Sequence, residues 1–186
     1  MRMPTLTTDR LAIRPFTLDD LAACHEVLGA VGEPITVEQR RDWLRWTVAS
    51  YVQLEALRQP PYGDRAIARR SDGALVGACG LVPCLAPFAQ LDADEPAAWT
   101  PEVGLYYELG PEHRGRGYAT EAVGELIQWA GDALRLQRIV ATTSYDNARS
   151  IALMERLGMV IKRNPLDGPA WFQVVGRWDY PAAIDT

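Results

Sequence analysis

The stretch RGRGYATEA at residues 114–122 decides how the rest of this 186-residue chain is interpreted. It stands where a strand-like segment gives way to an amphipathic helix, whose apolar positions recur at helical spacing over residues 119–134. Gly115 and Gly117 let the backbone approach a ligand closely, and the free N–H groups at a helix N-terminus attract anions. The stretch therefore predicts a phosphate-binding turn at the start of a helix.

A pair of glycines before a helix also occurs in plain turns, so the turn alone leaves a purely structural role open. Arg114 and Arg116 add positive charge beside it. The stretch matches neither G-x-x-x-x-G-K-S/T nor G-x-G-x-x-G, which counts against nucleoside-triphosphate and dinucleotide sites.

The segments on either side alternate between strand and helix patterns. Before the turn we expect a strand over residues 11–15, helices that open at Thr17 and Thr36, and a hairpin over residues 65–81. We further expect strands over 102–109, 138–143, 160–162 and 171–178, and helices over 118–135 and 147–157. This order predicts one mixed α/β sheet with helices on both faces.

Residues 82–101 carry four prolines and several acidic residues, so a loop insertion is expected there. Long loops in compact domains are often functional, and this one could cover the acceptor site or be a plain insertion.

Composition excludes several classes of function. With 48% hydrophobic residues and a net charge of -5, the chain fits an ordinary soluble domain and disfavours nucleic-acid binding. No run of about 18 apolar residues and no signal peptide is found, so a cytoplasmic protein that does not span a membrane is expected. Three cysteines without a C-x-x-C pair and two histidines offer no plausible metal site.

The turn and its surroundings carry a family resemblance. Arg114-x-x-Gly117-x-Ala119 matches the Q/R-x-x-G-x-G/A acyl-CoA signature of the GNAT superfamily of N-acetyltransferases. Residues 8–15, TDRLAIRP, resemble the T-x-R-L-x-L-R-P opening of the branch that contains the ribosomal-protein N-terminal acetyltransferases. Residues 107–112, YELGPE, resemble that branch's lead-in to the turn, and residues 147–150, NARS, resemble its N-x-x-S stretch.

This resemblance implies a GNAT-like single domain over residues 1–186, with a mixed, mostly antiparallel central sheet that is splayed at the acyl-CoA cleft. It implies acetyl-CoA as co-substrate and no metal. The residues expected to bind acetyl-CoA are Tyr107, Leu109, Arg114, Gly115, Arg116, Gly117, Tyr118, Ala119, Thr120, Asn147 and Ser150. The resemblance also implies that a main-chain amide within residues 107–109 polarises the thioester carbonyl.

Acetyl transfer requires a neutral amine, yet an alkyl ammonium group has a pKa of about 10 and is mostly protonated at pH 7. Glu102 and Glu108 share one face of their strand by its two-residue period, so both are expected to face one cleft. Either carboxylate could take the amine proton, or both could only attract a cation. The branch's usual strand glutamate falls on Gly104 in this chain.

The leaving thiolate also needs a proton. Many superfamily members supply it from a tyrosine seven residues after the helix-opening asparagine, but that position here is Met154. Ser150 becomes the candidate acid, and Asn147 could equally serve only as the N-cap of its helix.

The sequence thus predicts an N-acetyltransferase that moves an acetyl group from acetyl-CoA to a primary amine by direct attack in a ternary complex. The acceptor could be a protein N-terminus or a small amine such as a polyamine, an amino acid or an aminoglycoside. A catalytically silent acyl-CoA-binding module is a third possibility. Either a monomer or a homodimer is compatible with the sequence.

Overall fold

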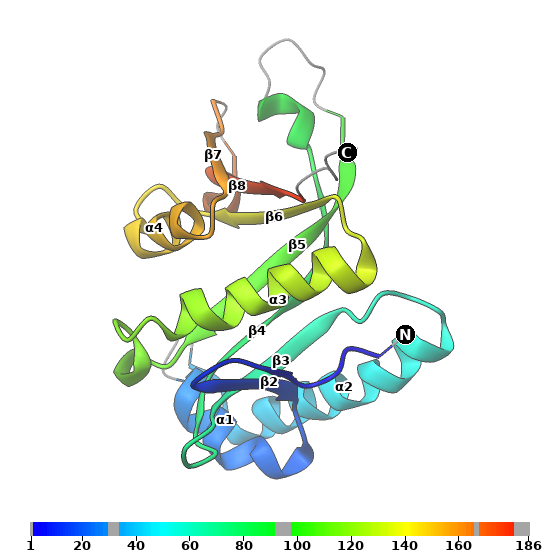
Figure 1. Ribbon diagram of the computed structural model, residues 1–186, viewed down its shortest axis with the longest axis vertical. Coiled ribbons are helices and arrows are strands. Elements are labelled where there is room, and N and C mark those ends of the chain that lie inside the picture. The colour runs from blue at the N-terminus through cyan, green and yellow to red at the C-terminus, as the bar shows by residue number, and fades with distance from the viewer. Residues whose placement is uncertain (1, 30–33, 92–97, 166–167, 181–186) are drawn as a thin grey trace. The chain divides into compact units, whose positions relative to one another are not determined.

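A computed structural model describes residues 2–29, 34–91, 98–165 and 168–180 of the chain (Figure 1). The chain forms two compact units that interleave along the sequence. Unit 1 comprises Met1–Leu81 and Tyr106–Gln128, and unit 2 comprises Val82–Leu105 and Trp129–Thr186. Three elements run from one unit into the other: strands β4 (Leu75–Ala86) and β5 (Thr100–Leu109) and helix α3 (Tyr118–Leu134).

Unit 1 contains the N-terminal strands. They are β1 (Leu6–Thr7), β2 (Leu11–Pro15) and β3 (Gly63–Arg69), followed in the sheet by β4 and β5. Strands β1 to β4 pair antiparallel, each with its neighbour in sequence. The short connection between β3 and β4 agrees with the hairpin expected over residues 65–81, whereas the connection between β2 and β3 contains two helices.

Helices α1 (Leu21–Gly29) and α2 (Val37–Ala56) begin where the sequence places their caps. Thr17 and Asp20 form a capping box around the short 3-10 turn η1 (Leu18–Asp20) that precedes α1. At α2, the Thr36 hydroxyl accepts a hydrogen bond from the Gln39 amide at 3.2 Å. These bonds satisfy main-chain groups that a helix start leaves unpaired.

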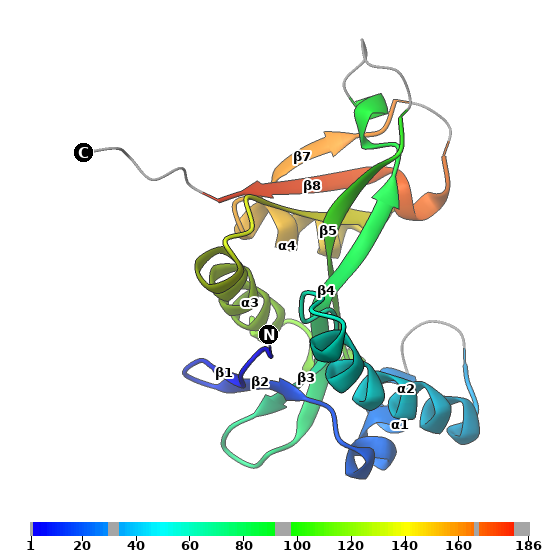
Figure 2. The same cartoon turned by 90° about the vertical axis from the view of Figure 1, so that its right-hand side faces the viewer.

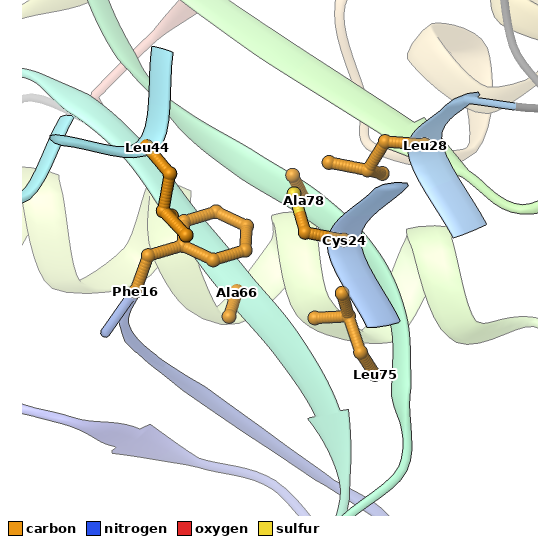
Figure 3. Close-up of a cluster of buried hydrophobic side chains, with 7 residues drawn as sticks. All are labelled: Phe16, Cys24, Leu28, Leu44, Ala66, Leu75 and Ala78. Atoms are coloured by element: carbon orange, nitrogen blue, oxygen red, sulfur yellow. The ribbon is translucent and has the colours of Figure 1, made fainter. Parts of the chain in front are cut away.

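The core of unit 1 joins these helices to the strands (Figure 3). Its fully or nearly buried members are Phe16, Cys24, Leu28, Leu44, Ala66, Leu75 and Ala78. The ring of Trp43 packs edge-on against Phe16 at 5.4 Å between centroids, a favoured aromatic geometry. Helices α1 and α2 lie on one side of the unit 1 strands and the first half of α3 on the other (Figure 2).

Unit 2 continues the sheet with β6 (Arg138–Thr143), β8 (Val174–Asp179) and β7 (Val160–Arg163), in the order β4-β5-β6-β8-β7. Strand β5 pairs in parallel with β6, with Gly104 opposite Val140, and β8 pairs antiparallel with both its neighbours. Helix α4 (Ala148–Arg156) packs against β6, β7 and β8. The expected mixed, mostly antiparallel sheet is confirmed.

A second core cluster fills the other face of the unit 2 strands. It contains Ala86, Phe88, Val140, Phe172 and Val175. Gly176, next along β8, instead faces α4, because a Cβ there would lie 2.6 Å from the sulfur of Met154.

The expected loop over residues 82–101 is wrong at both ends. Strand β4 continues to Ala86, the 3-10 turn η2 spans Phe88–Leu91, and β5 begins at Thr100. Pro83 fits in β4 because the pairing with β3 ends at Leu81, so its missing N–H costs no bond on that side. Residues 92–97 of the expected loop lie outside the described residues.

Cys24, Cys79 and Cys84 are free thiols. Within the described ranges, no helix is both long and apolar enough to cross a membrane.

We expect Gly77→Val to destabilise the protein by about 3 kcal/mol or more, because overpacking at a close backbone contact forces strands apart. A Cβ at Gly77 would lie 2.2 Å from the Glu108 carbonyl oxygen. The control is Gly29→Ala, whose Cβ would meet only His25 at 3.8 Å. Urea unfolding should show a large loss for the first variant and none for the second, and equal midpoints would contradict the packing described.

Candidate active site

The turn before α3 is built as a cradle of main-chain groups. Gly115 and Gly117 adopt φ values of 74° and 78°, in the left-handed region that favours glycine. A Cβ at Gly115 would meet nothing within 4 Å, so the loop surface is open there. The Glu121 amide bonds to the Gly117 carbonyl at 3.1 Å, and the three amides before it start the helix without intrahelical acceptors. This exposed N-terminus fits an anionic group such as a pyrophosphate.

Arg10 holds the cradle from β2's side, and sequence reasoning missed this role. Its Nη1 donates to the Arg116 carbonyl at 3.0 Å and its Nε donates to the Glu121 carboxylate at 2.6 Å. Its guanidinium also lies over the Tyr118 ring, 4.8 Å from the centroid. Burial raises the pKa of Glu121, but hydrogen bonds from Thr8 and Arg10 outweigh it and lower that pKa. The cradle is thus fixed by contacts with a segment more than a hundred residues earlier.

The expected ligand-binding residues of unit 1 form one continuous region. The Arg114 Nε donates to the Leu109 carbonyl at 3.1 Å and so ties the cradle to the end of β5. Leu109 is buried and Tyr107 half-buried. Tyr118 is buried at the start of α3, with Ala119 and Thr120 half-buried after it.

Asn147 and Ser150 lie in unit 2, at the start of α4. Asn147 is the N-cap, and its side-chain oxygen accepts from the Ser150 amide at 3.2 Å. The N-cap role is therefore confirmed, and a role beside acetyl-CoA stays a prediction. Met154, which stands where many family members have a tyrosine, is fully buried and belongs to the core of unit 2.

Glu102 also lies in unit 2, where its carboxylate pairs with Arg138 at 3.4 Å. Its side chain is only 18% exposed and lines a pocket of about 320 Å³. Arg138, Lys162 and Arg177 line the same pocket together with the apolar residues Phe88, Ala89, Leu91, Val140 and Val175. The Glu102 carboxylate therefore pairs with Arg138 and also lines the pocket.

Glu108 belongs to unit 1 and lies in a different environment. It is half-buried, and burial raises its pKa against the hydrogen bond from Tyr106 and the charges of Arg40 and Arg114. A carboxyl group with a raised pKa is a better proton acceptor near neutral pH. The expectation that Glu102 and Glu108 face one cleft stays a prediction.

Asp64 is a second unusual carboxyl group of unit 1, and sequence reasoning missed it. Burial raises its pKa, as does the negative charge of Glu108, to about 6 against the opposing charge of Arg65. Asp64 lies at the start of β3, where charged residues are common at strand ends. Its sequence position therefore gave no sign of its interaction with a residue of β5.

Among the residues that the structure describes, no group of three or more His, Cys, Asp or Glu side chains is placed to hold a metal ion.

Comparison with known proteins identifies the class that this fold and site define. A family model described as an acetyltransferase (GNAT) domain matches residues 10–160. The uncharacterized N-acetyltransferase p20 of Bacillus licheniformis is 32% identical over 163 residues, which cover 83% of this chain and 82% of that protein. The chain belongs to the GNAT family of acetyltransferases. It is an acyl-CoA-dependent N-acetyltransferase whose co-substrate is acetyl-CoA.

Solved structures agree on the fold. An acetyltransferase from Agrobacterium tumefaciens str. C58 is 25% identical with a TM-score of 0.69, over 96% of this chain and 95% of that one. RimL, a ribosomal L7/L12 alpha-N-protein acetyltransferase solved in complex with coenzyme A, is 13% identical with a TM-score of 0.61. That match covers 93% of this chain and 94% of RimL.

We expect Gly117→Val to abolish measurable acetyl-CoA binding while the fold survives. The added side chain strains the backbone at positive φ, and its Cβ would lie 3.4 Å from Nη2 of Arg10, which holds the cradle. The matched control is Gly158→Val, because Gly158 has a similar φ of 77° and nothing within 4 Å of a Cβ. Calorimetric titration with acetyl-CoA should separate the two variants, and equal affinities would place the phosphate site elsewhere.

Proposed function

We propose that the chain transfers the acetyl group of acetyl-CoA to a primary amine by direct attack in a ternary complex. The observation that carries this is the cradle of residues 114–120, whose open loop and helix N-terminus suit the pyrophosphate of coenzyme A. In the same proposal Arg116 adds positive charge, and Asn147 and Ser150 contact the pantetheine arm or the thiol. Ser150 then protonates the leaving thiolate.

Glu108 is the proton acceptor in this proposal. Its environment already raises its affinity for a proton, whereas the Glu102 carboxylate is held by Arg138. Main-chain N–H groups of residues 107–109 polarise the thioester carbonyl, which stabilises the oxyanion that forms on attack. Glu102 helps to bind the acceptor, through the pocket that it lines.

A protein N-terminus is the proposed acceptor. An α-amino group has a pKa of about 8, against about 10 for an alkyl amine, so a carboxyl group of raised pKa deprotonates it more easily. The resemblance of residues 8–15 and 147–150 to the ribosomal-protein branch favours the same acceptor.

A small amine is the alternative acceptor, and the Glu102 pocket favours it. Its volume of about 320 Å³ is sufficient for a small molecule, and because Arg138, Lys162 and Arg177 outnumber Glu102 in its lining, an amine that also carries an anionic group, such as an amino acid, fits it best. A silent acyl-CoA-binding module is the third candidate, because Met154 replaces the usual tyrosine and the branch's strand glutamate falls on Gly104.

We also propose that the two units form one domain, because β4, β5 and α3 each run through both. A location in the cytoplasm is supported by three free cysteines, which suit a reducing compartment. The assembly is proposed to be a monomer or a homodimer.

Release of free CoA from acetyl-CoA, followed with a thiol reagent, tests the acceptor. We expect peptides with a free N-terminus to be acetylated at least about tenfold more efficiently in kcat/KM than polyamines, amino acids or aminoglycosides, as expected for about 1.4 kcal/mol of discrimination. The same peptides with acetylated N-termini are the control. Preference for a small amine would select the alternative, and binding of acetyl-CoA without any turnover would select the silent module.

Glu108→Gln should lower turnover by about 10²-fold at pH 7, because the amine proton loses its acceptor. In the wild type, kcat/KM should rise as the pH rises through the elevated pKa of Glu108, since only the carboxylate accepts a proton. The variant should lack this rise, and its deficit should shrink at high pH, where the free amine is abundant.

Glu102→Gln is the matched comparison for this experiment, and we expect it to change mainly KM. The reverse pattern would assign the proton acceptor to Glu102. Identical pH profiles in all three proteins would leave water or backbone in that role.

A further inference from the structure

Asp64 is a half-buried carboxyl group of unit 1 to which the proposed function gives no role. Its side chain shares a strand face with Ala66, which packs in the core with α1 and α2. Strands β3 and β5 flank β4, so Asp64 and Glu108 come from the two neighbours of one strand. Glu108 shares a face of β5 with Tyr106, which packs against the same core. Asp64 and Glu108 therefore belong to one cluster beside the α1-α2 region.

The two carboxyl groups interact with each other. Burial and then the charge of Glu108 raise the pKa of Asp64 to about 6, although Arg65 opposes this. A repulsion between two like charges acts equally on both, so ionised Asp64 also favours protonation of Glu108. Such a pair binds its first proton more tightly than either carboxyl group would alone.

The polar and charged groups around the pair do not cancel the raised pKa of Glu108. The Tyr106 hydroxyl bonds to Glu108, and the charges of Arg40 and Arg114 lower the pKa of Glu108, yet burial still leaves it raised. The Tyr51 hydroxyl donates to the main-chain carbonyl of Asp64, not to its carboxylate.

The two thiols in the cluster add no charge at neutral pH. Burial raises the pKa of Cys24 to about 11 and that of Cys79 to about 12.

Asp64 and Glu108 do not simply balance the charge of bonded basic side chains. Arg65 is buried, its guanidinium lies 4.1 Å from the Tyr51 ring centroid, and its Nη1 donates to the main-chain carbonyls of Gly63 and Asp64. Its Nε has no hydrogen-bond partner. Within the described part of the chain, neither Asp64 nor Glu108 forms an ion pair with a basic side chain. The cluster therefore holds two carboxyl groups on the same side of β3 and β5 without a bonded cation.

We infer that Asp64 and Glu108 work as one proton-accepting pair, in which Glu108 meets the acceptor amine and Asp64 is a positioning residue that acts through Glu108. This inference rests on the proposed function and adds Asp64 to it. The ionised Glu108 carboxylate also attracts the ammonium form of the acceptor, which carries the proton to be removed.

The step balances within the pair and the two substrates. An N–H bond of the ammonium group breaks, and its proton converts the pair from two carboxylates to one carboxylate and one carboxylic acid. The freed lone pair of nitrogen bonds to the acetyl carbon, the C–S bond breaks, and the thiolate of CoA leaves with the electron pair. The Ser150 hydroxyl gives its proton to the thiolate and regains one from the new amide nitrogen, and the pair then releases its own proton to water.

Two variants that act in opposite directions test the pair. Asp64→Asn removes the like charge, so the acid limb of the kcat/KM profile should move to lower pH by at least about half a unit. Tyr106→Phe removes a hydrogen bond that lowers the pKa of Glu108, so the limb should move to higher pH. Acetyl-CoA affinity should stay within about twofold of wild type in both. The control is Asp42→Asn on the exposed face of α2, which should leave the limb in place.

Carbon-13 NMR titration of the Glu108 carboxyl group gives a readout that does not need turnover. We expect its midpoint to fall in Asp64→Asn and to rise in Tyr106→Phe, with thermal melts confirming that both variants fold. An unchanged Glu108 midpoint in folded Asp64→Asn would overturn the pair. Absence of turnover with every amine in the wild type would instead refute the proposed function, whatever the titration shows.

Discussion

The close packing of the end of β5 against β4 and α1 is the constraint on which the candidate site depends. A Cβ at Gly77 of β4 would lie 2.2 Å from the Glu108 carbonyl oxygen. One at Gly110, just after β5, would lie 2.8 Å from a methyl carbon of Val27 in α1. The Gly110 amide also donates to the Val76 carbonyl at 3.0 Å. Only residues without side chains allow this contact, which fixes the main chain around Glu108.

The same short segment connects the chemistry of unit 1 to the cradle. Glu108 and Leu109 end the strand, and the Arg114 side chain returns to the Leu109 carbonyl. Arg10 then holds the far side of the cradle through the Arg116 carbonyl and the Glu121 carboxylate. Packing of β5 against β4 thus positions the proposed proton acceptor, and the hydrogen bonds of Arg114 and Arg10 connect this segment to the cradle.

Sequence reasoning succeeded where the determining interactions are local. The cap at Thr36 and the glycine turn before α3 could be predicted because the residues that form each of them lie within a few positions of one another. It failed where residues far apart in the sequence interact. Nothing in the sequence shows that Asp64 of β3 interacts with Glu108 of β5, or that Arg10 bonds to Glu121 of α3. The continuation of β4 through Pro83 was also hidden, because it depends on where the neighbouring strand stops.

A cradle made of main-chain amides bears on which acyl chains the protein can select and on how far its sequence can diverge. In the proposed function its donors bind the pyrophosphate, which every acyl-CoA carries, so the cradle would not distinguish a short acyl chain from a long one. Any preference must be set by the side chains that surround the thioester. Main-chain donors are also inherited with the fold itself, so the rest of the sequence can drift. The fold itself is shared with RimL at only 13% identity.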